Sequence, residues 1–143
     1  MKLSIGSLCL LLVWGLAPSL SATPAGGPVM QVAASELELN GREKWQVDPA
    51  MMVHLRAIEV ELGSHEGKTV ADYHKLASRL QKSLGLLVAS CSMKGKAHDQ
   101  LHKWLVPFMQ EVGALSQASE VPTLEKVHRS LQERFVVFNC YFR

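Results

Sequence analysis

From residue 49 onward, apolar residues recur at intervals of three and four in four successive blocks. This spacing places them along one face of an α-helix, so it predicts four amphipathic helices. Short segments marked by Gly or Pro separate the blocks, and loops of that length join helices that run antiparallel to each other. We therefore expect an all-α fold, an up-down-up-down four-helix bundle.

Local signals mark where the first two helices begin and end. Asp48 followed by Pro49 is typical of an N-cap with proline at the first helical position, and Gly63 ends the first helix. Thr69 and Asp72 have the spacing of a capping box, with Asp in place of the usual Glu or Gln. This box predicts the start of a long second helix.

The third and fourth helices carry similar signals. Gly95 marks a turn, the third helix begins near Ala97, and Pro107 should kink this helix without ending it, because the apolar row continues in phase. Pro122 opens the fourth helix. The four expected core rows are Met51, Leu55, Ile58 and Leu62; Tyr73, Ala77, Leu80, Leu84, Leu87 and Cys91; Leu101, Leu105, Phe108, Val112 and Leu115; and Leu124, Val127, Leu131, Phe135, Phe138 and Phe142.

The segment before the helices predicts a short β-hairpin or cap. Asn40-Gly41 is a strong signal for a tight hairpin turn. Apolar residues lie on both sides of it, namely Leu37, Leu39, Trp45 and Val47. We expect this segment to pack on the helical bundle.

The first residues have the pattern of an export signal. Lys2 precedes an apolar run from Ile5 to about Leu16, and small residues then offer a cleavage site after Ser21 or Ala22. We expect a signal peptide over residues 1–22, a flexible leader over residues 23–35, and a single helical domain over residues 36–143. The mature chain would be soluble and periplasmic or secreted, because no later apolar run is long enough to span a membrane.

The charge balance limits the class of partner. The chain has 15 Lys and Arg residues against 13 Asp and Glu residues, a net charge of +2. A value so close to zero argues against binding to nucleic acid or to an anionic membrane surface.

Two cysteines, Cys91 and Cys140, lie outside the predicted signal peptide. In an oxidising compartment two cysteines favour a disulfide. The predicted bundle argues against it, because the second and fourth helices lie diagonally, with axes about 11–14 Å apart, and Cys140 is out of phase with its core row. Whether the two cysteines pair stays open at this point.

The strongest chemical signal is a cluster of soft ligands. Within twelve residues the chain places Cys91, Met93, His98 and His102. Thiolate and thioether sulfur favour Cu(I), and imidazole binds both copper and zinc. His98 and His102 are four residues apart and share one face of a helix. This spacing predicts a metal site.

The bundle topology extends this cluster. One end of the bundle would gather the start of the first helix, the end of the second, the start of the third and the end of the fourth. We expect Cys91, His98 and His102 as ligands, Met93 as a weaker fourth ligand, and His54 or Met51 as substitutes. The other end would carry His65, His74 and His128, which we expect on the surface.

Two functions are compatible with these residues. The first is a periplasmic protein that binds one copper ion, Cu(I) in preference, or zinc at the same ligands, for metal buffering, transfer or sensing. The second is a metal-free helical module that binds a protein or small-molecule partner, in which Cys91 fills the core and the histidines are solvated. No constellation of residues supports an enzyme. The sequence HDQLH differs from the metalloprotease pattern by its shorter Asp99 and lacks a third ligand.

The stretches KWQVDPAMMVHL, SCSMKGKAHDQLHKWLVPFM and FVVFNCYFR resemble a group of small exported bacterial helical-bundle proteins to which no activity is assigned. The likeness spans about residues 37–143. Its most specific part is Cys-x-Met-x-Gly-x-x-His-Asp-x-Leu-His-x-Trp-Leu. The resemblance implies a bacterial periplasmic setting. Some members carry a His-rich leader that would suit metal handling, and this chain lacks it.

Overall fold

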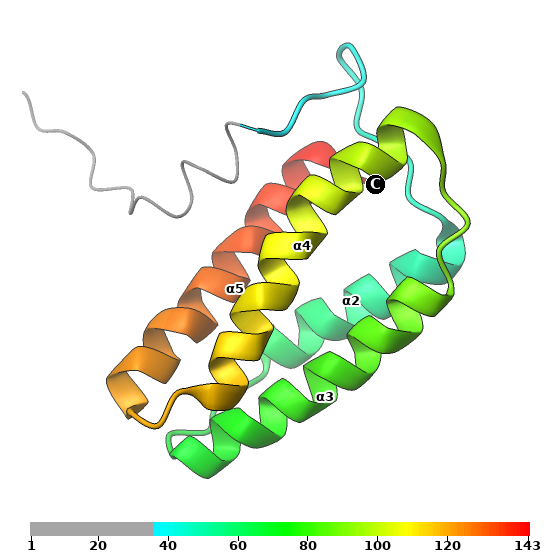
Figure 1. Ribbon diagram of the computed structural model, residues 1–143. Coiled ribbons are helices and arrows are strands. Elements are labelled where there is room, and N and C mark those ends of the chain that lie inside the picture. The colour runs from blue at the N-terminus through cyan, green and yellow to red at the C-terminus, as the bar shows by residue number, and fades with distance from the viewer. Residues whose placement is uncertain (1–35) are drawn as a thin grey trace, which may run out of the picture.

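The computed structural model describes residues 36–143, which form four α-helices (Figure 1). With the labels of Figure 1, the helices are α2 (Pro49–Gly63), α3 (Val70–Ala89), α4 (Gly95–Gln117) and α5 (Val121–Tyr141). Each helix packs against the next one along the chain, and α5 also packs against α2. The diagonal helices α3 and α5 touch much less. The predicted all-α, up-down-up-down four-helix bundle is confirmed.

The predicted signal peptide and leader, residues 1–22 and 23–35, lie outside the described residues. Within residues 36–143, no helix is long and apolar enough to cross a membrane.

The predicted apolar rows meet in one core. Nearly all of their members are buried, while Val127 and Cys91 are only half-buried. Trp104 is also fully buried. Its ring stacks on that of Phe108, with the ring centroids 4.9 Å apart, and its indole N–H donates to the carbonyl of Arg134 at 2.7 Å. Phe135, Phe138 and Phe142 extend this aromatic cluster toward the C-terminus. The aromatic cluster packs α4 against α5.

Several helix boundaries agree with their sequence signals and two differ. The capping box of Thr69 and Asp72 is present, and α4 continues through Pro107. However, α3 ends at Ala89, so Cys91 lies in the following loop and not on the helix as predicted. Helix α4 starts at Gly95, two residues before the predicted start, because Gly95 adopts a positive φ of 66° and directs the chain into the helix.

The N-terminal segment forms a cap with a tight turn. Asn40 and Glu43 exchange backbone hydrogen bonds around Gly41, whose φ is 66°. The predicted hairpin does not extend beyond this single bridge, because the next residues pair elsewhere: Trp45 receives a hydrogen bond from Arg143 N–H and donates to the carbonyl of Tyr141. The cap is thereby joined to the end of α5, and the buried side chains of Leu37 and Val47 extend the core.

Candidate metal centre

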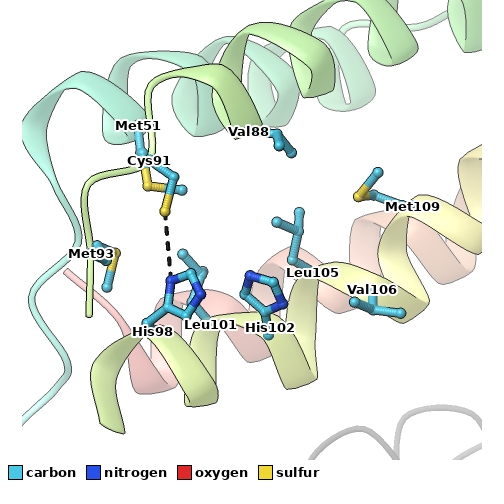
Figure 2. Close-up of a pocket in the computed structure, with 10 residues that line it drawn as sticks. All are labelled: Met51, Val88, Cys91, Met93, His98, Leu101, His102, Leu105, Val106 and Met109. Atoms are coloured by element: carbon cyan, nitrogen blue, oxygen red, sulfur yellow. Dashed lines mark hydrogen bonds between the residues drawn. The ribbon is translucent and has the colours of Figure 1, made fainter. Parts of the chain in front are cut away.

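A pocket of about 460 Å³ opens where α3 passes into α4 (Figure 2). Four sulfur-bearing side chains and two imidazoles line it: Met51, Cys91, Met93, Met109, His98 and His102. The rest of its lining is aliphatic, from Val88, Leu101, Leu105 and Val106. Of the residues that the structure describes, no Asp, Glu, Lys or Arg lines this pocket. We call the end of the bundle that contains Met51, Cys91, Met93 and His98 the sulfur pole.

A thiol and an imidazole face each other in this pocket. Cys91 Sγ lies 3.6 Å from His98 Nδ1, within hydrogen-bonding distance for sulfur, and Figure 2 shows the two side chains directed toward each other. Both residues are half-buried. Depending on where the proton resides, the thiol donates to Nδ1 or the Nδ1–H donates to a thiolate. The pair therefore shares one exchangeable proton, and a metal ion that binds both atoms displaces this proton.

The loop that carries Cys91 is held at both of its ends. At the end of α3, the Ser90 hydroxyl donates to the Leu87 carbonyl at 2.9 Å. At the start of α2, one carboxylate oxygen of Asp48 accepts hydrogen bonds from Ser92 N–H at 2.9 Å and from the Ser92 hydroxyl at 2.6 Å. These contacts fix the backbone on both sides of Cys91 and so position its sulfur.

The role of Asp48 corrects an expectation from the sequence. Asp48 occupies the N-cap position of α2, but its side chain makes no capping hydrogen bond. Its carboxylate contacts Ser92, 44 residues further along the chain. The hydrogen bond from the Ser92 hydroxyl, followed by that from the Ser92 N–H, lowers the pKa of Asp48 below its ordinary value. Asp48 thus connects α2 to the Cys91 loop.

The two histidines of α4 have different settings. Their ring centroids are 4.3 Å apart, as expected for residues four positions apart on a helix. His98 is half-buried against Cys91, whereas His102 is exposed at the edge of the pocket. The structure therefore places His98 inside the pocket and His102 at its mouth.

Three thioethers line the pocket at different depths and at different distances from the Cys91–His98 pair. Met51 of α2 is fully buried beside Cys91, and Met93 lies in the loop near His98 (Figure 2). Met109 lies further along the pocket and is 42% exposed. The sequence analysis did not include Met109 among the candidate ligands. Its position seven residues after His102, on the same face of α4, was the signal that could have identified it.

Other candidates from the sequence lie apart from this pair. His54 does not line the pocket, and Cys140 is exposed on α5, the helix diagonal to α3. Cys91 and Cys140 are both free thiols. Within residues 36–143, no three His, Cys, Asp or Glu side chains gather closely enough to hold a metal ion. Any ligand set beyond Cys91 and His98 therefore depends on thioethers or on movement of His102.

The opposite end of the bundle, which we call the imidazole pole, contains His65, His74 and His128. These residues, which the sequence places on the surface, are half-buried. The carbonyl of Leu62 accepts a hydrogen bond from His128 Nε2 at 2.9 Å, and the carbonyl of Ala118 accepts one from His74 Nε2 at 2.9 Å. Carbonyls at the ends of α2 and α4 have no partners within their own helices, so these imidazoles serve as caps.

His65 lies within a small group of rings at the imidazole pole. Its ring centroid is 4.8 Å from that of Tyr73 and 5.2 Å from that of His128. Burial is the main cause that lowers the pKa of His65, and the nearby charges of His128 and Arg79 lower it further, while Asp72 acts in the opposite direction. His65 is therefore favoured in its neutral form.

Comparisons of the chain with protein-family models, with curated proteins and with solved structures found no match. The resemblance to exported bacterial helical-bundle proteins stays a prediction.

Proposed function

We propose that this protein binds one copper ion, as Cu(I), at the sulfur pole. Cys91 and His98 would be the principal ligands, and the thioethers of Met93 and Met51 would complete the set. The observation that carries the proposal is the 3.6 Å contact between Cys91 Sγ and His98 Nδ1 inside a pocket lined by thioethers. Copper would be buffered there or passed to a partner in the periplasm, whereas bulk storage would need many more cysteines than this chain has.

The spacing of the two principal ligands suits a bound metal. In tetrahedral zinc sites, bonds of about 2.3 Å to sulfur and about 2.0–2.1 Å to nitrogen separate the two ligand atoms by about 3.5–3.6 Å. This is the separation of Cys91 Sγ and His98 Nδ1. A metal ion could therefore replace the shared proton without rearrangement of the backbone, and its affinity should fall at low pH, because both ligands must lose their protons.

The other residues of the pocket favour Cu(I) over other metals. Thioether sulfur is a soft ligand that prefers Cu(I), while Mg²⁺ and Ca²⁺ require oxygen ligands, which no carboxylate of this lining supplies. Zinc at the same ligands is the near alternative. Structural zinc sites use four Cys, His or carboxylate ligands, and within residues 36–143 no three such side chains gather closely enough to hold a metal ion.

A metal-free interaction module is the second candidate, because much of the pocket is aliphatic. Val88, Leu101, Leu105 and Val106 give it the lining that is typical of sites for apolar ligands. This candidate predicts that neither Cu(I) nor Zn(II) raises the melting temperature specifically, since only a ligand of the folded state stabilises it. It also predicts that replacing His98 leaves metal affinity unchanged.

The test is a competition titration with Cu(I) under anaerobic conditions against a chromophoric chelator. We expect one site, and we expect its affinity to fall by about 100-fold or more in Cys91→Ala, because even replacement of outer partners at metal sites costs about 10–100-fold. Cys140→Ala is the matched control, since it removes the other free thiol from an exposed position outside the pocket. Equal affinities of the two variants would refute the copper site.

A further inference from the structure

A second pocket, of about 340 Å³, lies between the N-terminal cap and the first turns of α4. We call it the cap pocket. One wall belongs to the cap and the other to α4, and the walls include Glu38, Leu39, Trp45, Lys96, Asp99 and Gln100. It shares no residue with the pocket at the sulfur pole. Its volume is at the lower end of the range of about 300–1,000 Å³ that is typical of small-molecule sites, which suits a ligand of one ring.

The backbone of Glu38 holds the two walls of the cap pocket together. Its N–H donates to Gln100 Oε1 at 2.9 Å, and its carbonyl accepts a hydrogen bond from the indole N–H of Trp45 at 2.6 Å. Two side chains that line the pocket are thereby fixed to one residue of the cap. A ligand meets a preformed site, which lowers the cost of ordering these side chains when it binds.

Gln100 is a buried polar residue with a hydrogen-bonding group left over. It is only 7% exposed and lines the cap pocket. Its Oε1 accepts from Glu38, but no atom of the described residues accepts from its Nε2, and Nε2 is not fully enclosed. An amide nitrogen can donate two hydrogen bonds, and the donors of buried side chains normally have partners. This unused donor points to a polar ligand in the cap pocket.

The charges that line the cap pocket balance each other. Lys96 and Lys103 supply two positive charges, and Glu38 and Asp99 supply two negative ones. None of the four forms an ion pair among the described residues. An anion would meet two carboxylates and a cation would meet two ammonium groups, so an isolated ion gains little here. Ammonium groups only donate and carboxylates only accept, which suits a neutral ligand whose groups do both.

We propose that the cap pocket binds a neutral pyranose sugar. Each sugar hydroxyl both donates and accepts, so the hydroxyls hydrogen-bond to the carboxylates, the ammonium groups and the amide of Gln100. The C–H groups on one side of the sugar ring pack against the indole of Trp45, because the face of an aromatic ring is negative. The site goes beyond the proposed copper site and is independent of it, since Gln100 lies about 160° around α4 from His98.

Two-dimensional proton–nitrogen NMR of the metal-free protein tests this site at the residues concerned. The probes are D-glucose, D-galactose, D-mannose and N-acetyl-D-glucosamine, each titrated to millimolar concentrations. At least one of them should shift the side-chain amide signals of Gln100 and the indole N–H signal of Trp45, and the shifts should saturate. The indole N–H of Trp104 is an internal control, since it donates to the carbonyl of Arg134 in the core and should not move.

A lysine variant separates contact with the ligand from an effect on the fold. Lys96 is exposed and lines the cap pocket, so Lys96→Ala should weaken the binding of the sugar about tenfold, because a hydrogen bond to a charged group is lost. Lys94→Ala is the matched control, since Lys94 is also exposed but does not line the pocket. Its affinity should equal that of the unchanged protein.

Three results would overturn the proposal. The first is the absence of any shift at Gln100 and Trp45 with all four sugars. The second is equal affinity of Lys96→Ala and Lys94→Ala for the sugar. The third is a response to glycine, a zwitterion, with no response to the sugars, which would assign the pocket to amino acids. Because no metal is present and the two pockets share no residue, failure of this test is distinct from failure of the copper titration.

Discussion

The two ends of the bundle use histidine in different ways. At the imidazole pole, His74 and His128 donate to carbonyls at helix ends, and His65 packs against the ring of Tyr73. At the sulfur pole, His98 contacts the thiol of Cys91 inside a pocket lined by thioethers. An imidazole that caps a helix has one nitrogen engaged by a backbone carbonyl, whereas Nδ1 of His98 faces a thiol whose proton a metal ion can displace. The contrast suggests a structural role for one pole and a binding role for the other.

The largest expected difference between the poles is the response of stability to copper. Cu(I) at a free concentration of 1,000 times its dissociation constant should stabilise the protein by about 4 kcal/mol. The increase in melting temperature should disappear in His98→Gln and persist in the double variant His65→Gln, His128→Gln. Thermal unfolding under anaerobic conditions, with and without Cu(I), measures both. An increase that is lost only in the double variant would reverse the assignment of the two poles.

The next effect tests whether the imidazole pole is tightly packed. A Cβ at Gly67 would lie 2.4 Å from the Cβ of Asp72 and 2.8 Å from the ring of His65, so Gly67→Ala should lower the free energy of unfolding by about 1–3 kcal/mol. Gly85→Ala is the control, because its added Cβ meets nothing within 4 Å and lies in a helix, where Ala is better by about 0.5–1 kcal/mol. Urea denaturation of both variants gives the comparison. Equal stability of the two would mean that the pole is loosely packed.

A smaller effect separates the two histidines of the sulfur pole. His102 is exposed at the mouth of the pocket, and His98 is half-buried against Cys91. We expect His102→Gln to weaken Cu(I) binding by about tenfold at most, a loss typical of a supporting partner, and His98→Gln to weaken it far more. Competition titrations of the two variants measure the difference. A larger loss in His102→Gln would show that this residue moves inward as a principal ligand.

The smallest effect concerns pH and belongs to the imidazole pole. The pKa of His65 is lowered from 6.5 in the folded protein, chiefly by burial, so the unfolded chain binds its proton more readily. The contribution of His65 to stability is therefore complete above about pH 6.5. It is lost as the pH falls through the lowered pKa that His65 has in the folded protein. Urea denaturation across this range should show a weaker pH dependence in His65→Gln than in the unchanged protein. An unchanged dependence in His65→Gln would contradict the assignment.

The fold could be predicted from the sequence because its signals are local. The apolar rows, the capping box of Thr69 and Asp72, and the Pro49 start of α2 each involve residues within a few positions of one another. Tertiary contacts were not predicted. The sequence did not predict that the Asp48 carboxylate accepts a hydrogen bond from Ser92. It also did not predict that Arg134 is buried and forms an ion pair with Glu111 at 2.6 Å. These partners are distant in the chain, and no local periodicity links them.

The candidate site was predictable in its chemistry and less so in its geometry. Because Cys91, Met93, His98 and His102 lie close together in the sequence, we expected them to share one site. All four line one pocket. Helical phase placed Cys91 on α3, but the helix ends at Ala89 and the loop directs the thiol toward His98. His54, expected as a substitute ligand, is not among the residues that line the pocket.

The most direct test of the copper site is X-ray absorption spectroscopy of the protein loaded with one equivalent of Cu(I). The proposed ligands predict that sulfur and nitrogen scatterers are both bound to the copper ion. In Cys91→Ala the thiolate sulfur should be lost, and in the double variant His65→Gln, His128→Gln the spectrum should be unchanged. A copper environment of nitrogen alone, unaffected by Cys91→Ala, would contradict the account.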